Sequence, residues 1–284
     1  MPRTGLEPAR LAALPPQSSA SANFATWARA AIIRMSKNVS RGRRVSNACC
    51  AQSTSRALRL ATMSRTRIKI CGVMRAQDAV AAADAGADAI GLVFHPAAKR
   101  CIALDRAREI LAALPAFVTP VGVFVGQPID EVRRVASELG LRHLQLNGSE
   151  EADVVKALEP FTIIKAVHVD RQTISQDLAR WRDAIAPKRI SNLRGIVLDT
   201  AAHAPGGTGI ANDWETIQSA KAAGAFDGLP PIIAAGGLTP ENVAAVVRNL
   251  RPWAVDVSSG VESTPGVKST KKIEAFVRAV REQQ

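Results

Sequence analysis

The stretch Arg67-Ile68-Lys69-Ile70-Cys71-Gly72 ends a predicted strand on a cysteine. A purely structural cysteine more usually sits inside such an alternating, β-branched run, whereas Cys71 stands where the chain begins to turn. An ionised thiol at that place could act as a base or a nucleophile. The other interpretation is a small apolar side chain that fills space at the end of the strand.

A carboxyl group follows a second predicted strand in the same way. Four apolar or small residues lead directly into Asp199 and Thr200, and a flexible segment rich in Ala and Gly follows them. A carboxyl that faces a partly desolvated site favours its protonated form, which suits it to donating a proton near neutrality. The alternative is that Asp199 caps the loop that follows it.

Two glycine-rich segments follow the last two predicted strands. Gly236 and Gly237 come after the first of them, and Asp256-Val257-Ser258-Ser259-Gly260 spans the end of the second. Glycines let backbone N–H groups approach an anion closely, and a helix N-terminus behind them adds its dipole. The pair predicts a phosphate site, although tight turns alone would also require glycine.

Arg100 follows the second predicted strand, in the segment 91–100. A guanidinium there could hold a substrate carboxylate through two hydrogen bonds, or it could be a solvated surface group. A thiol, a carboxyl, a phosphate site and a cation together indicate proton-transfer chemistry on a small, phosphorylated, anionic molecule. The sequence contains no cluster with metal-ligand spacing and no dinucleotide fingerprint, so we expect no metal and no cofactor.

These residues need a scaffold that brings the ends of several strands together. From residue 66 onward, short apolar strands alternate with amphipathic helices, which predicts right-handed βαβ units and a parallel sheet. Eight units favour a single (β/α)8 TIM barrel over a doubly wound open sheet, and chemistry then lies at the carboxyl ends of the strands. The predicted strands are 68–71, 89–94, 120–125, 143–146, 162–167, 195–199, 231–235 and 254–257, and the predicted helices are 77–85, 105–114, 129–139, 150–158, 172–184, 213–223, 240–249 and 270–282.

The chain of 284 residues has a net charge of +12, but this charge is unevenly distributed. Residues 1–65 contain 11 of the 37 Lys and Arg residues and one of the 25 Asp and Glu residues. The remainder, 66–284, is close to neutral, so the predicted catalytic domain is not a nucleic-acid binder. No apolar run approaches the ~18 residues that a membrane span needs. The four cysteines show neither disulfide nor metal spacing, which favours a cytoplasmic protein.

Residues 1–65 lack a sustained helical or strand period and are rich in Ser, Ala and Pro, so we predict a disordered basic extension. Three explanations compete for it. It could be an organelle transit peptide, a nucleic-acid-binding arm, or a translation start assigned too far upstream. We favour the last, with Met63 as the true initiator, because Met63 stands only four residues before Arg67, where the first strand-like run begins.

Several motifs recur together in one known family. They are KICG at 69–72, GLVFHP to Arg at 91–100, QLNG at 145–148, VLDT at 197–200, GGTG at 206–209 followed by Asp213 and Trp214, AGGLTPENV at 235–243, DVSSGVE at 256–262 and PGVK at 265–268. By these motifs, residues 67–284 resemble the phosphoribosylanthranilate isomerases of tryptophan biosynthesis. The chain departs from the family pattern at Ala98, Lys99, Asn147, Ile210 and Ser269, where the family commonly has Ser, Pro, His, a basic residue and Asp. None of these departures removes a candidate catalytic group, but they leave the loop around Arg100 the least well matched.

The resemblance implies an aldose–ketose isomerase, that is, an intramolecular oxidoreductase without a cofactor. Its reaction is the Amadori rearrangement of N-(5-phosphoribosyl)anthranilate to 1-(o-carboxyphenylamino)-1-deoxyribulose 5-phosphate. By similarity, Asp199 is the general acid that opens the furanose ring and Cys71 is the general base at C2′. A nearby positive charge should lower the pKa of the Cys71 thiol. By the same similarity, Arg100 binds the anthranilate carboxylate.

The resemblance and the residues leave two rival functions and an open oligomeric state. One rival is a histidine-pathway type of phosphosugar isomerase, against which Cys71 argues because that family has an Asp in its place. The other is a catalytically silent ligand-binding barrel, against which the presence of both Cys71 and Asp199 argues. We expect a small phosphosugar substrate as partner, no nucleic acid or membrane partner, and a monomer or homodimer. The substrate-binding residues expected are Arg100, Gly236, Gly237, Asp256, Ser258, Ser259 and Gly260.

Overall fold

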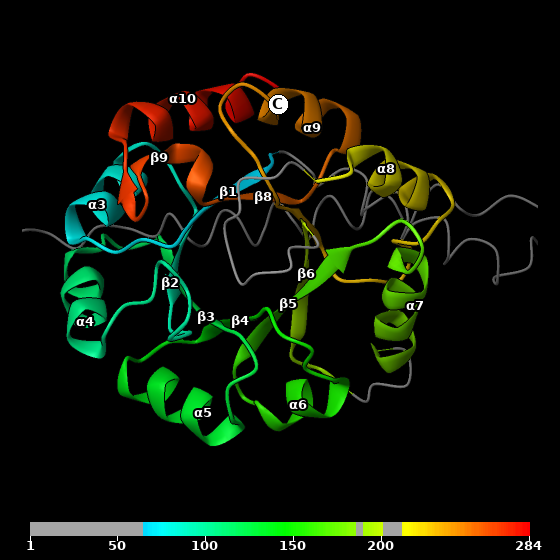
Figure 1. Cartoon of the computed structure of the whole chain (residues 1–284), viewed down its shortest axis with the longest axis horizontal. Helices are drawn as coiled ribbons and strands as arrows, with labels where there is room; N and C mark the ends of the chain where they lie inside the picture. Colours follow the sequence, from blue (N-terminus) through cyan, green and yellow to red (C-terminus); the bar gives the residue numbers. More distant parts are fainter. Residues whose placement is uncertain (1–64, 186–189, 201–211) are drawn as a thin grey trace, which may run out of the picture. The chain divides into compact units, whose positions relative to one another are not determined.

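The structure is a computed structural model that describes residues 65–185, 190–200 and 212–284. Eight parallel strands form a closed barrel in which β1 also pairs with β8 (Figure 1). This confirms the predicted (β/α)8 barrel, while the predicted extension, apart from Arg65, lies outside the described residues. The strands are β1 (Arg67–Cys71), β2 (Ala89–Val93), β3 (Thr119–Phe124), β4 (His143–Leu146), β5 (Thr162–Val169), β6 (Leu193–Thr200), β7 (Ile232–Ala234) and β8 (Ala254–Val257).

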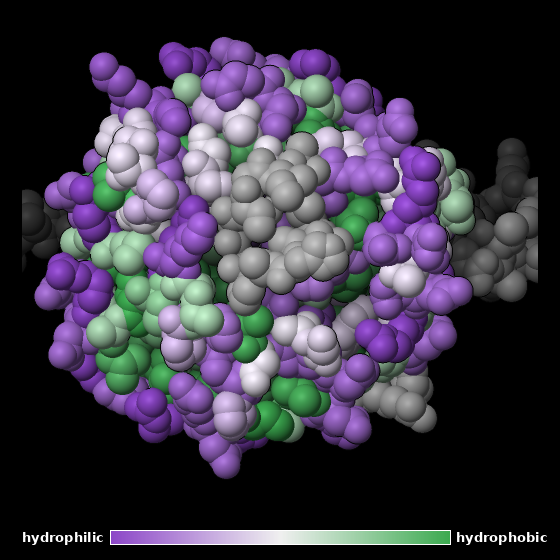
Figure 2. All heavy atoms as spheres, in the orientation of Figure 1, coloured by the Kyte–Doolittle hydropathy of each residue, from purple (hydrophilic) through white to green (hydrophobic). Residues whose placement is uncertain are grey.

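Helices surround the strands as an outer layer (Figure 1). Each helix turns an apolar stripe toward the sheet, as in the last one, where Ile273, Phe276, Val277 and Val280 are buried at helical spacing. The outward surfaces of the helices are largely hydrophilic (Figure 2). The helices are α3 (Ala76–Asp84), α4 (Leu104–Ala113), α5 (Ile129–Glu138), α6 (Ala152–Ala157), α7 (Ile174–Ile185), α8 (Trp214–Ala222), α9 (Val243–Leu250) and α10 (Thr270–Arg281).

The strands divide their side chains between two apolar clusters. Ile68 and Ile70 of β1 belong to the large cluster between sheet and helices. Successive side chains of a strand point to opposite faces, so Lys69 and Cys71 face the inside of the barrel. In β6, Ile196 and Leu198 belong to that same large cluster. Asp199 therefore faces inward as Cys71 does.

Most predicted elements are confirmed with small shifts at their ends, but two features differ. The helix expected from residue 240 begins at Val243, because Asn242 accepts a hydrogen bond from the Thr239 N–H at 2.8 Å and donates one to the Gly237 carbonyl at 2.9 Å. These bonds keep Thr239 and Pro240 in a turn. After β8, a short 3-10 helix, η1 (Ser259–Val261), and a hairpin of β9 (Glu262–Thr264) and β10 (Val267–Lys268) were not predicted.

None of the helices in the described part of the chain is long and apolar enough to cross a membrane.

Candidate active site at the carboxyl ends of the strands

Cys71 ends β1 and is half-buried, and two glycines make room around it. A Cβ atom on Gly91, the residue paired with Cys71 on β2, would lie 2.7 Å from the Cys71 Sγ atom. Gly72 has a φ of 68°, which a residue with a side chain rarely adopts, and a Cβ there would overlap the Arg100 side chain. Both glycines are therefore required for the thiol to stand at this strand end.

Asp199 lies near the carboxyl end of β6, opposite His168 of β5 in the register, and is half-buried. The structure thus places the predicted acid and the predicted base on the inner face and at the same end of the barrel. The GGTG motif and Ile210 belong to the segment 201–211, which lies outside the described residues.

Lys69, the preceding residue on the same face of β1 as Cys71, belongs to a buried ion pair. The Lys69 Nζ and Asp256 Oδ2 atoms are 2.6 Å apart, and both side chains are 6% exposed. Burial opposes the charge on Lys69, but Asp256 and the Cys71 thiolate outweigh it and raise the pKa of Lys69 above its usual value. Lys69 is therefore a permanent cation beneath Cys71, and Asp256 holds a lysine rather than facing solvent. The other Asp256 oxygen, Oδ1, is buried and accepts no hydrogen bond from the residues that the structure describes.

The Cys71 thiol responds to opposing influences. Burial raises its pKa above the usual value and is the largest effect, the positive charges of Lys69 and Lys268 lower the pKa, and Asp256 raises it. The balance is a raised pKa. Nearby positive charge thus lowers the pKa of Cys71 as expected, but desolvation of the thiolate outweighs the two lysines.

Arg100 is buried, which excludes the solvated-surface interpretation. Its Nε and Nη2 atoms donate to Glu262 Oε1 and Oε2 at 2.6 and 2.7 Å, so the guanidinium and carboxylate form a two-bond ion pair. Lys268 joins the same carboxylate, with 2.9 Å between its Nζ atom and Glu262 Oε1. The sequence identified Arg100 but missed Lys69, Glu262 and Lys268. These three residues lie in the motifs KICG, DVSSGVE and PGVK, respectively. Their positions in the sequence do not show which residues they contact in the folded barrel.

The two glycine-rich segments meet at the ends of β7 and β8. Gly236 and Gly237 have φ values of 91° and 62°, which require glycine. Within residues 65–185, 190–200 and 212–284, the N–H groups of these two glycines donate to no protein acceptor. Gly260 packs so closely on the Leu238 carbonyl that a Cβ atom would overlap it. Ser258 and Ser259, half-buried, complete the second segment.

The departures from the family pattern are accommodated locally. The Asn147 Oδ1 atom accepts a hydrogen bond from the buried Gln145 at 2.8 Å, at the mouth of β4. Ser269 still caps α10, because its hydroxyl accepts a hydrogen bond from the Lys272 N–H at 3.4 Å. The Oε1 atom of Gln145, however, is buried and accepts no hydrogen bond from the residues that the structure describes.

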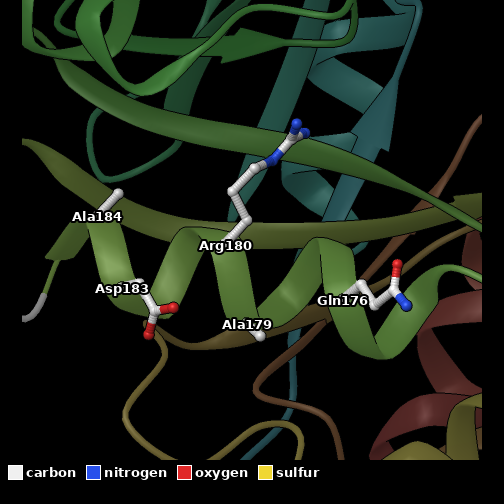
Figure 3. A pocket seen from close by; sticks show the side chains of 5 residues that line it. All are labelled: Gln176, Ala179, Arg180, Asp183 and Ala184. Atoms are coloured by element: carbon white, nitrogen blue, oxygen red, sulfur yellow. The ribbon is translucent and has the colours of Figure 1, made fainter.

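A separate depression lies on α7 and carries no comparable chemistry. Figure 3 shows that its five lining residues all come from this helix and that Arg180 and Asp183 point apart. Arg180 is 59% exposed and pairs with Glu151 at 3.4 Å. The candidate active site is therefore the barrel mouth. Among the described residues, no group of three or more His, Cys, Asp or Glu side chains is placed to hold a metal ion.

A closed parallel barrel with an acid, a thiol and glycine loops at its carboxyl end belongs to the class of phosphate-binding TIM-barrel enzymes. Residues 68–279 match the sequence model of the family described as "N-(5'phosphoribosyl)anthranilate (PRA) isomerase", and the chain belongs to this family. It is thus an isomerase.

Individual relatives agree with the family match. The N-(5'-phosphoribosyl)anthranilate isomerase of Pseudomonas fluorescens SBW25 is 44% identical over 221 residues, which cover 77% of this chain and 97% of that protein. The N-(5'-phosphoribosyl)anthranilate isomerase of Herminiimonas arsenicoxydans is 41% identical over 221 residues, which cover 76% of this chain and 93% of that protein.

Solved structures share the fold. Phosphoribosyl anthranilate isomerase from Thermotoga maritima is 36% identical, with a TM-score of 0.67 and with 76% of this chain and 99% of that one covered. A phosphoribosyl anthranilate isomerase in complex with reduced 1-(o-carboxyphenylamino)-1-deoxyribulose 5-phosphate is 35% identical, with a TM-score of 0.64 and with 76% and 99% covered.

The contact between Gly260 and Leu238 generates a prediction about stability and anion binding. Gly260→Ala forces the segment after β8 to move away from a backbone carbonyl, which we expect to destabilise the protein by about 1–3 kcal/mol. The displaced segment should also weaken competitive inhibition by inorganic phosphate. Calorimetry and steady-state kinetics measure the two effects.

Gly140→Ala is the control, because Gly140 also has a positive φ but a Cβ there meets nothing within 4 Å. It should lower stability by about 1–2 kcal/mol through backbone strain alone and leave phosphate inhibition unchanged. Unchanged phosphate inhibition in Gly260→Ala would argue against a phosphate site at this segment.

Proposed function

We propose that this chain converts N-(5-phosphoribosyl)anthranilate to 1-(o-carboxyphenylamino)-1-deoxyribulose 5-phosphate in tryptophan biosynthesis. The observation that carries the proposal is the placement of Cys71 and Asp199 on the inner face of β1 and β6, at the carboxyl end of the barrel. The family match over residues 68–279 supports it independently. A coupled assay with purified protein and freshly prepared substrate tests it directly.

Asp199 serves as the general acid of the first step. It gives its proton to the ring oxygen of the furanose as the C1′–O bond breaks. The lone pair of the anilino nitrogen forms the C=N bond, so the open-chain product of this step is a protonated imine. A carboxyl group that faces the inside of the barrel at this strand end is placed to give a proton to a bound substrate.

Cys71 serves as the general base of the second step. Its thiolate takes the proton from C2′, the C–H electron pair forms the C1′=C2′ bond, and the imine nitrogen becomes a neutral amine. The resulting enolamine tautomerises to the ketone. The positive imine beside Cys71 adds to the fields of Lys69 and Lys268, which already favour the thiolate, and offsets the effect of burial. A larger fraction of the thiol is therefore ionised at the stage that uses the thiolate as a base.

The two anionic ends of the substrate are bound by two different groups of residues. The N–H groups of Gly236 and Gly237 and the segment Ser258–Gly260 are suited to the phosphate. Arg100 is suited to the anthranilate carboxylate, because its pair with Glu262 uses Nε and Nη2 along one edge of the guanidinium. The edge formed by Nη1 and Nη2 keeps donors for a second carboxylate.

The remaining partners follow from the size and charge of the substrate. A small phosphosugar requires neither nucleic acid nor a membrane, and we place the reaction in the cytoplasm with the other soluble steps of the pathway. One solved relative from T. maritima is described as dimeric, with monomers derived from it. We propose a monomer or a homodimer for this chain.

The first prediction from this mechanism concerns the base. Cys71→Ala should reduce kcat by about 10²–10⁴-fold, the usual contribution of a positioned base, while the unfolding temperature changes little. Cys71→Ser should be nearly as inactive, because a hydroxyl is a far weaker base than a thiol. Retention of more than about a tenth of the wild-type kcat by Cys71→Ala contradicts the assigned role.

The second prediction concerns pH. The thiolate is the active form, so the rate rises with pH as the thiol ionises. Because burial raises the pKa of Cys71 in the free enzyme, the rising limb of kcat/KM should lie above the ordinary range of a thiol. The limb of kcat should lie at lower pH, because kcat reports the substrate complex, where the positive imine favours the thiolate.

Profiles of both constants across the alkaline range measure the two limbs. Cys101→Ser is the control, since this second half-buried thiol has no role in the mechanism and its loss should leave both limbs in place. The interpretation is wrong if the limb of kcat lies at the same pH as that of kcat/KM or above it.

The third prediction concerns the carboxylate. Arg100→Ala should raise KM roughly ten- to a hundredfold, the value of a charge-assisted two-bond contact, and should change kcat less. The carboxylate is remote from C1′ and C2′ and is bound alike in the ground and transition states. Arg100→Lys should recover only part of the loss, because an ammonium cannot form two parallel bonds.

Lys99→Ala is the matched control, because Lys99 is the exposed neighbour of Arg100 and should be replaceable without effect. Should Lys99→Ala be the damaging change and Arg100→Ala the silent one, the assignment of Arg100 fails.

A further inference from the structure

Arg100, Glu262 and Lys268 form a buried cluster at the mouth of the barrel. Their side chains are 7%, 5% and 0% exposed. Glu262 is the shared member: its Oε1 atom accepts from Arg100 Nε at 2.6 Å and from Lys268 Nζ at 2.9 Å, and its Oε2 atom accepts from Arg100 Nη2 at 2.7 Å. One carboxylate thus fixes two cations that come from distant parts of the chain.

The same cluster is joined to the glycine-rich segment after β8. The Lys268 Nζ atom donates to the Ser258 carbonyl at 3.0 Å. A Cβ on Gly72 would overlap the Arg100 side chain and would lie 3.1 Å from the Ser258 hydroxyl, so Arg100 and Ser258 both lie against the turn that follows Cys71. The proposed carboxylate-binding and phosphate-binding groups are therefore connected through Glu262 and Lys268, beside the base.

We propose that Glu262 is a positioning residue that orients Arg100 toward the carboxylate of the substrate and holds it at a set distance from the phosphate-binding segment. Through this arrangement, Glu262 contributes to the choice of phosphoribosyl amines that carry an ortho-carboxylate. The inference rests on the proposed function of Arg100. Glu262 is buried and its two oxygens accept from Arg100 and Lys268, so its proposed effect on the substrate is exerted through Arg100.

The geometry indicates which substitution separates this role from simple packing. Glu262→Gln keeps the shape of the side chain and one acceptor oxygen. That oxygen can still serve Arg100 Nε and Lys268 Nζ. The amide nitrogen then replaces Oε2 and faces the Arg100 Nη2 donor, so the bond that sets the rotation of the guanidinium is lost. Arg100 remains present and charged but is no longer held in one orientation.

The experiment compares two substrates, N-(5-phosphoribosyl)anthranilate and its carboxylate-free analogue N-(5-phosphoribosyl)aniline. With the first, Glu262→Gln should lower kcat/KM roughly tenfold or more, mainly through KM, as expected for loss of a hydrogen bond between charged groups. With the analogue, the same variant should match the wild type within about threefold, since no carboxylate is there to be held. A merely structural role would damage both substrates equally.

Two further variants complete the test. Glu262→Asp keeps the charge but shortens the side chain, so it should show a smaller loss with the same preference for the analogue, and it decides the question if Glu262→Gln does not fold. Glu138→Gln is the matched control. Glu138 also pairs with two arginines, Arg108 and Arg134, but on the exposed face of α5, and its replacement should leave both substrates unaffected.

Equal losses on the two substrates, or no loss on either, would overturn the inference. Arg100→Ala, measured on the same two substrates, separates this failure from failure of the proposed function. If Arg100→Ala is selective for the carboxylated substrate and the Glu262 variants are not, only the role of Glu262 is wrong. If Arg100→Ala is not selective either, the assignment of Arg100 to the carboxylate is wrong as well.

Discussion

The buried pair of Lys69 and Asp256 is the contact on which the site depends. The two residues are directly opposite in the register that joins β1 to β8, so their ion pair lies at the seam where the barrel closes. Removing one partner of such a pair leaves an uncompensated charge in the interior, at a cost of about 3–5 kcal/mol. The barrel therefore closes in the register that pairs them. Cys71, the next residue on the same face of β1, then lies beside the positive charge of Lys69.

That charge bears on the proposed role of Cys71 as a base, because it favours the thiolate of this half-buried residue. Inside the barrel the thiolate is penalised by desolvation, which is why the pKa of Cys71 is raised in the unliganded site. Lys69 and Lys268 oppose the penalty without removing it. In the proposed mechanism the missing stabilisation comes from the substrate, whose positive imine forms only after the ring has opened. In that mechanism the thiolate is least populated in the free enzyme and most populated beside the intermediate, which would limit reaction of the thiol with other molecules.

The groups proposed to bind the two ends of the substrate are themselves restrained. Arg100 is held along one edge by Glu262, and the turn after β7 is held by the side chain of Asn242. Ordering these groups during folding removes an entropic cost from substrate binding. The same restraint explains why glycine is required at residues 72 and 260, where any side chain would displace a binding group.

The sequence by itself determined the order of strands and helices and the location of the candidate site. Local periodicity predicts that Cys71 and Asp199 lie at or next to the carboxyl ends of β1 and β6, and parallel strands bring such ends to one side of a barrel. Only the tertiary structure decided which partners these residues have. Lys69 and Asp256 are 187 positions apart in the sequence, and Arg100 and Glu262 are 162 positions apart. The pairing of such distant residues depends on closure of the whole sheet. The sequence around an arginine does not show whether its guanidinium is exposed at the surface or paired with a buried carboxylate. Burial is a property of the closed barrel and not of the local segment.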